Sequence, residues 1–464
     1  MRTDKVVAKK RQNFKKELHE HFKEENAKKK KTGAYAEDPY EFRHDYRLTK
    51  ENKETSDKLF DQLYQEGNKS IIVQKKKDFE ILIANLINQK RKPIKFSFDN
   101  NNWGKGRYKS ASYSTWKSAN KLIENKYVMK VKEGVNAPNY KRVSRIEAED
   151  KLRELFPELH SAVIIEPVEL VELHKTEYGT NGKKLEKKSL VDYNENELPA
   201  KTQLEITRIR GILKRLNKVN SEADIRAGKY KLSSNSVAIF TDSFDLYGRI
   251  HAKGFSHQQG SGDKKENADF YRKDITINGN RIIELDYKAL HPHLLYAKIK
   301  QQYPDDKDPY SVVFPEITNP NDSNIARSFL KILLLAMLNS KDKIIAESAA
   351  NHHVYKEKIS KDLIRIGIIK KVSLDEFGKV IEKFKEAHEP IAHFLCTGNQ
   401  TGLKLMNKDS KIALAVVDHF AKQGFPILPV HDSFIVEEQH EDKLKSVMED
   451  VYRKQSHGFK IPVR

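Results

Sequence analysis

Apolar residues follow two patterns in the second half of the chain, and the patterns meet at Asp286. Residues 282–285 form a short apolar run typical of a buried strand, and the apolar residues of 290–299 recur at helical spacing. The pattern therefore predicts that Asp286 lies where a strand gives way to a helix. A second apolar run, residues 426–436, predicts another strand, and Asp432 lies within it.

Further helices are predicted where apolar residues cover one face. Residues 327–340 form such a helix, on which Arg327 and Lys331 are one turn apart and point from the same face. Residues 203–219 predict a basic amphipathic helix. This helix suits the backbone of a nucleic-acid duplex, although a solvated charged face is the more common explanation.

A compact domain is predicted at residues 59–160. A helix at 114–125 is followed by strands at 127–131 and 139–146, with a turn around Gly134. This order is typical of winged-helix domains, in which the helix enters a major groove and the hairpin contacts phosphates. The expected phosphate contacts come from Lys130, Lys132, Lys141, Arg142 and Arg145. The alternative is a helical domain whose hairpin makes protein contacts.

The net charge narrows the class of partner. The 464 residues include 86 Lys and Arg against 66 Asp and Glu, a formal charge of +20 at pH 7. This excess favours nucleic acid, with an acidic membrane surface as the lesser alternative. Residues 1–58 are expected to form a basic, partly flexible tail, which either binds a phosphate backbone or only keeps the chain in solution.

Cysteine content and hydropathy bear on the compartment. Cys396 is the only cysteine, so an internal disulfide is excluded and a reducing compartment is expected. No run of about 18 apolar residues occurs, and the first residues lack the apolar centre of a signal peptide. These features predict a soluble, cytoplasmic protein with no membrane partner.

The two aspartates indicate a metal site. An unpaired carboxylate is costly inside an apolar strand, so Asp286 and Asp432 are expected to share a divalent cation. Mg²⁺ takes oxygen ligands, and two-metal sites drive in-line phosphoryl displacement; Mn²⁺ is the alternative ion. Arg327 and Lys331 suit a triphosphate, and Lys331 is a candidate general acid for departing pyrophosphate. The alternative is a basic stripe on a surface helix.

The order of these motifs resembles that of the family A DNA polymerases and their relatives, the single-subunit phage-type RNA polymerases. The matching residues are, in order, Arg249, Asp286-Tyr287, Arg327-x3-Lys331 and His431-Asp432. The matched region spans residues 246–463. Its Asp-Tyr pair is closer to the DNA polymerases, whereas the HDSF sequence at 431–434 is closer to the RNA polymerases.

The resemblance implies a role for each matched residue. By this likeness Asp286 and Asp432 hold the metals together with Tyr287, and Lys331 joins the aspartates as a catalytic residue. Nucleotide binding falls to Arg327, Lys331, Tyr287, His291 and Asn339. Primer and template binding falls to Arg249, His431 and Gln258, and the helix before the last motif carries Asp409 and Ser410.

The resemblance also implies an α+β fold built as a right-hand polymerase. It comprises an antiparallel palm, helical fingers and a small thumb, preceded by the winged-helix-like domain. The expected segments after residue 160 are linker and thumb-like helices at 161–240, the first part of the palm at 241–300, fingers at 301–399 and the second part of the palm at 400–464.

Two positions depart from the family pattern and bear on the choice of sugar. Asn339-Ser340 stands where the family's fingers helix carries a Tyr-Gly pair, and His291 stands where the family carries Glu or Gly. A bulky His291 is expected to exclude a 2′ hydroxyl by volume, which predicts a preference for dNTPs. The alternative is an imidazole that hydrogen-bonds this hydroxyl and favours ribonucleotides.

These features predict a DNA polymerase of family A type, a nucleotidyltransferase that acts in DNA replication on a DNA primer-template with nucleoside triphosphates. The alternatives are an RNA polymerase or primase, an RNA template, and a non-catalytic DNA-binding replication initiator with a degenerate palm. A metal phosphohydrolase is less well supported, because its His-Asp pair usually lies on a helix. His291 and His293 also lack the carboxylate or cysteine partners of a metal site.

Overall fold

The computed structural model describes most of the chain after residue 41. The described residues are 42–64, 69–88, 93–98, 103, 111–112, 114–132, 135–137, 140–156, 163–178, 184–228, 230–233, 235–260 and 270–464. The chain divides into two compact units, Met1–Ile164 and Ile165–Arg464. Each unit is described by itself.

The folded part of the first unit begins earlier than the sequence indicates. Residues 1–41 of the predicted tail, like Gly134, lie outside the described part of the chain, but β1 (Tyr46–Leu48) and α2 (Lys50–Leu63) are ordered elements. Leu48, Leu59 and Phe60 are buried in the core of this unit. Residues 46–58 therefore belong to the folded unit rather than to a tail.

Helices in the first unit pack with a three-stranded antiparallel sheet of order β2-β6-β3. Residues 79–87, on α3, are all buried and form the centre of the core. The strands are β2 (Ile94–Phe96), β3 (Val128–Lys132) and β6 (Ser144–Ala148), and the helices besides α2 are α3 (Lys69–Ile87), α4 (Ser114–Glu124) and α5 (Asp150–Arg153).

The hairpin after α4 is more divided than expected. Strand β3 pairs with β6, and a second pair, β4 (Val135–Ala137) with β5 (Tyr140–Arg142), lies between them in the sequence. The strand predicted at 139–146 is thus two strands, β5 and β6, separated at Val143. The last strand of the unit, β7 (Val163–Ile165), pairs with β1.

A four-stranded sheet opens the second unit, where the sequence analysis expected a linker and thumb-like helices. Its order is β13-β12-β8-β9, with β12 parallel to β8 and the other pairs antiparallel. The strands are β8 (Val171–Tyr178), β9 (Lys184–Leu190), β12 (Ser236–Thr241) and β13 (Ser243–Ala252). The expected helix is present as α6 (Ala200–Glu222), but its apolar face is buried in the main core of the unit.

The two predicted strands that carry the aspartates pair in a second sheet of order β15-β17-β16. Strand β15 (Ile282–Asp286) confirms the first prediction. The second prediction was wrong in one respect, because residues 426–436 form a hairpin of β16 (Leu428–Val430) and β17 (Ser433–Glu437) rather than one strand. Asp432 therefore lies in the turn of a hairpin.

A third sheet packs against one face of the sheet that carries the aspartates. Its order is β11-β10-β14, and it packs against Leu428 and Ile435 of the aspartate-bearing sheet through Ile225 and Ile275. The strands are β10 (Ile225–Ala227), β11 (Tyr230–Lys231) and β14 (Ile275–Ile277). Apolar contacts on this face hold the hairpin that carries Asp432.

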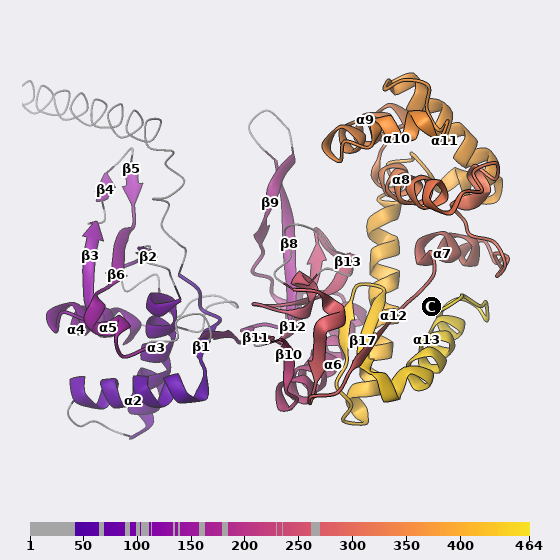
Figure 1. The fold of residues 1–464 in the computed structure, drawn as a ribbon. Coiled ribbons are helices and arrows are strands. Elements are labelled where there is room, and N and C mark those ends of the chain that lie inside the picture. Colours follow the sequence, from indigo (N-terminus) through magenta and orange to yellow (C-terminus); the bar gives the residue numbers. More distant parts are fainter. Residues whose placement is uncertain are drawn as a thin grey trace, which may run out of the picture. The chain divides into compact units, whose positions relative to one another are not determined.

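Helices complete the second unit, which makes the protein an α+β protein. Helix α12 extends from the cluster of α8 to α11 towards β17 (Figure 1). The helices are α7 (Leu290–Lys298), α8 (Pro320–Asn339), α9 (Lys343–Lys356), α10 (Ser360–Arg365), α11 (Leu374–Ala387), α12 (Thr401–Lys422) and α13 (Glu441–Gln455). Within the described residues, no helix is both long enough and apolar enough to cross a membrane.

Candidate active site

Asp286 lies at the end of β15 between two backbone neighbours. On one side it is paired with Ser433 of β17. On the other, its amide donates to the Arg464 carbonyl at 2.9 Å, and the Arg464 amide donates back to the Asp286 carbonyl at 3.1 Å. Backbone pairing on both sides fixes this aspartate, and the last residue of the chain contributes to it.

Asp432 is brought beside Asp286 by the hairpin turn. His431, the preceding residue, has a φ of 60°, and the Tyr287 amide lies 3.4 Å from the Asp432 carbonyl. Burial, and then the negative charge of Asp432, raise the pKa of Asp286 to about 7, while Lys331 and Arg464 oppose the shift. The two carboxylates are thus close enough to repel each other.

The donor set of this pair fits a hard divalent cation. Two carboxylates offer oxygen ligands only, and Mg²⁺ completes such a site with water and substrate phosphates. No group of three or more acidic, His or Cys side chains suited to a metal occurs among the described residues. Asp286 and Asp432 would therefore need ligands from the substrate, as is usual for Mg²⁺ in phosphoryl transfer.

Tyr287 does not supply its side chain to this site. The ring is 1% exposed, and the hydroxyl donates to the Met448 carbonyl at 2.6 Å. Strand alternation explains the placement, because the residue after Asp286 points to the opposite face of the sheet. The Tyr287 side chain is therefore a core residue, and the predicted role of Tyr287 in metal or nucleotide binding would involve only its backbone.

Helix α8 presents Lys331 to the aspartates. The helix starts with Pro320, and the Asn319 side chain accepts hydrogen bonds from two first-turn amides, a normal cap. Lys331 is exposed and makes no hydrogen bond or ion pair with any described residue. Its positive charge acts on Asp286 and favours the ionised carboxylate. Lys331 is therefore a cation whose amine is available for a ligand.

Arg327, one turn earlier, is already paired. Its Nε donates to the Asp308 carboxylate at 3.0 Å, and its guanidinium lies 5.1 Å from the centre of the Tyr310 ring. Burial opposes ionisation of Asp308, but Arg327 outweighs it and lowers the pKa of that carboxyl. The expectation of two equivalent cations on one face is thus modified, since Arg327 has a fixed orientation.

Tyr310 is a site residue that the sequence analysis missed. It is 3% exposed, and its pKa is raised chiefly by burial, with further contributions from the charges of Asp308, Asp432 and Asp286. Its hydroxyl therefore lies within electrostatic reach of both aspartates and of Arg327. The sequence carries no periodic signal for it, because Tyr310 lies in the connection between α7 and α8.

A buried carboxylate, Asp409 on α12, holds two of the predicted residues. Its side chain is 1% exposed and accepts from Arg249 Nε at 3.2 Å and from His291 Nε2 at 3.1 Å. Burial disfavours the charged guanidinium, but Asp409 outweighs it and raises the pKa of Arg249. Asp409 therefore fixes Arg249 and His291 together, and Asp432 also lies within electrostatic reach of Arg249.

Gly248, which precedes Arg249, has a steric reason to be glycine. Its φ is +78°, and a Cβ at this position would lie 2.8 Å from the Phe240 ring. Tyr247 before it has a φ of 67°, and the register of β13 with β12 shifts here. This irregular backbone directs Arg249 towards Asp409 on α12.

His431 lies beside the aspartates with one ring nitrogen unused. Its Nδ1 is buried and has no hydrogen-bond partner among the described residues, and its ring packs edge-on against His251 with centroids 6.0 Å apart. Burial, and then Arg249, lower the pKa of His431. Burial therefore favours the neutral imidazole, whose Nδ1 is enclosed in the protein.

The side chains of Gln258 and Asn339 are bonded to the backbone of the protein. The Gln258 amide accepts from the Ala252 amide at 3.0 Å and donates to the Pro429 carbonyl at 2.9 Å, so it ties β13 to β16. Asn339 is exposed at the end of α8 and donates to the Leu335 carbonyl. It lies about 12 Å along the helix axis from Lys331. Both side chains thus form internal hydrogen bonds, and their roles in primer and nucleotide binding stay predictions.

Comparison with known proteins gives no family assignment. No known protein family and no curated protein matches the sequence. Among solved structures, one match is the POL domain of Pol1 from M. smegmatis in complex with DNA primer-template and dNTP. It has 12% sequence identity and a TM-score of 0.29, and it covers 62% of this chain and 56% of that chain. At these values the likeness defines neither the fold nor the function of this chain.

Proposed function

We propose that the protein is a nucleotidyltransferase that extends a primer on a template, of the family A DNA polymerase type. The observation that carries the proposal is the pairing of Asp286 and Asp432 at the ends of adjacent strands, with Lys331 acting on Asp286. Two carboxylates and a nearby cation are the groups that in-line phosphoryl transfer uses. The order of motifs along the chain supports the same class.

Each residue near the aspartates has a role in this proposal. Asp286 and Asp432 hold two divalent cations, which when bound activate the primer hydroxyl and neutralise phosphate charge. Lys331 contacts the triphosphate and donates a proton to pyrophosphate. Arg327, oriented by Asp308, contributes a second positive charge.

The placement of His291 supports a preference for dNTPs. Its Nε2 is bonded to Asp409, a carboxylate with 1% exposure. Because this bond fixes the orientation of the ring, we propose that His291 excludes a 2′ hydroxyl by volume. The product is therefore proposed to be DNA. A hydrogen bond from Nδ1 to that hydroxyl is the alternative.

The first unit is proposed to bind nucleic acid as a winged-helix-like domain. The support is the order of α4 followed by the β3–β6 pair, and the exposed Lys130 and half-buried Lys132 on β3. Exposed apolar residues accompany them, with Met129 at 41% and Val131 at 43%. A basic and apolar surface of this kind suits phosphates and sugars.

Primer extension with separate dNTP and NTP pools, on DNA and on RNA templates, tests the reaction. Wild-type protein is expected to extend a DNA primer with dNTPs in Mg²⁺, and Asp286→Asn or Asp432→Asn to abolish extension while template binding persists. The matched control is Asp375→Asn, a surface carboxylate on α11 with 76% exposure. Activity of either site variant within about tenfold of wild type, about 1.4 kcal/mol on the barrier, contradicts the proposal. DNA binding without any extension favours a non-catalytic initiator.

A further inference from the structure

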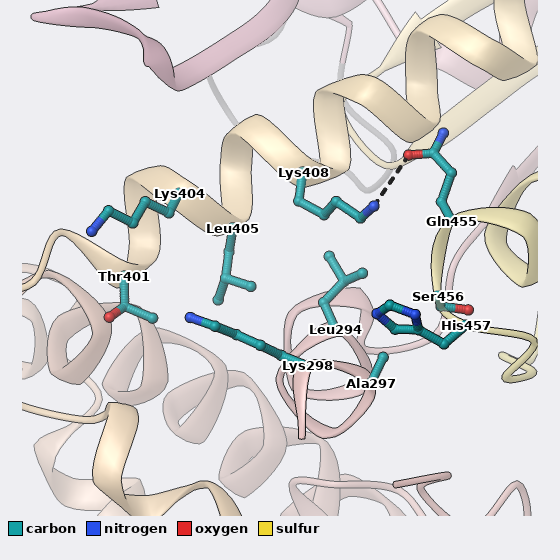
Figure 2. Close-up of a pocket in the computed structure, with 10 residues that line it drawn as sticks. All are labelled: Leu294, Ala297, Lys298, Thr401, Lys404, Leu405, Lys408, Gln455, Ser456 and His457. Atoms are coloured by element: carbon teal, nitrogen blue, oxygen red, sulfur yellow. Dashed lines mark hydrogen bonds between the residues drawn. The ribbon is translucent and has the colours of Figure 1, made fainter. Parts of the chain in front are cut away.

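A second basic site lies beside the candidate active site, between α7, α12 and the end of α13. It is a cavity of about 270 Å³. Figure 2 shows Lys298 from α7 and Lys408 from α12 around it, with Leu294 and Leu405 between them. The other polar lining residues are Thr401, Lys404, Gln455, Ser456 and His457. The cavity thus combines an apolar floor with amines.

The charge in this cavity is not balanced by the residues that line it. None of the described lining residues is acidic. Burial, and then Lys411, lower the pKa of Lys408, whose amine lies 3.5 Å from the Gln455 side-chain oxygen. Lys298 lies 4.5 Å from the centre of the Phe394 ring. An anion in the cavity would favour the charged form of Lys408, which burial and Lys411 disfavour.

The position of the cavity follows from the contact of α7 with α12. His291 on α7 is bonded to Asp409 on α12. Leu294 and Lys298 lie about one and two turns after His291 on α7. Lys408 and Lys404 precede Asp409 on α12. The cavity therefore begins about one helical turn from the His291–Asp409 contact.

We infer that this cavity binds one nucleotide, with its phosphate on Lys298 or Lys408 at either side of the cavity and its base and sugar on the floor formed by Leu294 and Leu405 between them. The volume suits a ligand of this size and no longer segment. The amines supply the charge that a phosphate needs. The nucleotide is either free or part of a single strand, and both sources present the same chemistry. The inference does not rest on the proposed polymerase reaction.

Titration calorimetry in EDTA tests the site with the full-length chain. The probes are dAMP, deoxyadenosine as the uncharged comparison, and a dT oligonucleotide of ten residues. The variant is Lys298→Gln with Lys408→Gln, and Lys445→Gln on the exposed side of α13 is the matched control. We expect affinity for dAMP, for the oligonucleotide or for both to fall at least tenfold in the double variant and less than twofold in the control. Deoxyadenosine is expected to bind weakly throughout.

The outcomes distinguish a free nucleotide from a single strand, and the cavity from the aspartate site. Loss confined to dAMP identifies a free nucleotide, and loss confined to the oligonucleotide identifies a strand. Equal binding in the double variant and in Lys445→Gln, for both probes, overturns the inference. The single variant Lys298→Gln, at an exposed position, repeats the test if the double variant does not fold. Binding that persists in Asp286→Asn distinguishes this cavity from the aspartate site, whatever the catalytic result.

Discussion

Asp286 and Asp432 bring two negative charges together. Among the described residues, the cation in salt-bridge contact with Asp286 is Arg464, whose Nη2 lies 3.9 Å from a carboxylate oxygen. Ionising Asp286 in the folded protein therefore costs free energy. Its pKa of about 7 lies well above its ordinary value of 3.8. Because the folded state keeps the proton longer, the contribution of Asp286 to the free energy of unfolding is highest below pH 4 and falls as pH rises to about 7.

Asp286→Asn should therefore stabilise the metal-free protein at pH 8. Solvent screening of a side chain with 34% exposure limits the expected gain to about 1–2 kcal/mol. The gain should shrink as pH falls from 7 towards 4, because wild-type Asp286 becomes neutral. Thermal unfolding between pH 4 and pH 8 in EDTA measures it, and added Mg²⁺ should stabilise wild type more than the variant. A pH-independent difference would assign the effect to packing rather than to charge.

His291 provides a second prediction at the residue scale. Replacing it by Gly removes the volume held by Asp409 and should lower the ratio of kcat/KM for dNTP over NTP by roughly tenfold or more. His291→Gln, which keeps a polar side chain of similar reach, is the control and should retain most of the preference. A wild-type preference for NTPs, or an unchanged ratio in the glycine variant, would show that His291 is not a volume gate.

At the scale of elements, helix α8 carries two cations, Lys331 without a described partner and Arg327 bonded to Asp308. Lys331→Ala should lower kcat/KM for the nucleotide by roughly 10- to 100-fold, about 1.4–2.7 kcal/mol, and leave stability nearly unchanged, because its amine has no described partner. Arg327→Ala should also lower kcat/KM, and in addition destabilise the fold by about 1–3 kcal/mol because Asp308 loses its partner. Steady-state kinetics and urea unfolding measure both effects, with Lys361→Ala on α10 as the control. Unchanged kinetics in both variants would make the face of α8 a surface stripe.

Elements with strong periodicity were predicted well, and those fixed by distant partners were not. Strand β15 and helices α6 and α8 are visible in the spacing of apolar residues. The turn at His431 and Asp432 was missed because it lacks the Gly, Asn or Pro that usually marks a turn. The sheet of β8, β9 and β12 was missed because its first two strands are largely polar, and β8 pairs in parallel with a strand that follows α6.

Only those residues of the candidate site that lie in sequence motifs could be predicted. Asp286, Asp432 and Lys331 were found because each lies in a strong local pattern. The bonds of Asp409 to Arg249 and His291 join residues 160 and 118 positions apart, and Asp308 meets Arg327 from a loop. Such contacts depend on the packing of α12 and α8, which periodicity does not specify. The hydrogen bonds of the Gln258 and Tyr287 side chains to backbone carbonyls could not be predicted from the sequence for the same reason.

At the scale of the whole molecule, charge and chemistry are divided between two units. The first unit carries α4 and the β3–β6 pair, which are proposed to bind nucleic acid, and the second carries the aspartates, α8 and the basic cavity. Each unit has its own hydrophobic core. A chain of residues 165–464 is therefore expected to fold alone, with helical content and a cooperative thermal transition.

The truncated chain tests how the two units share nucleic-acid binding. Removing residues 1–164 should weaken binding to a primer-template and flatten its dependence on salt, because each lost phosphate contact lowers the slope of log affinity against log salt by about 0.9. Extension of a preformed primer-template at low salt should survive, since the proposed catalytic residues all lie in Ile165–Arg464. Fluorescence anisotropy from 50 to 300 mM salt, roughly the range over which counterion release dominates, measures the slope. An unchanged slope with unchanged extension would assign the first unit to protein contacts, since its lysines would then displace no counterions.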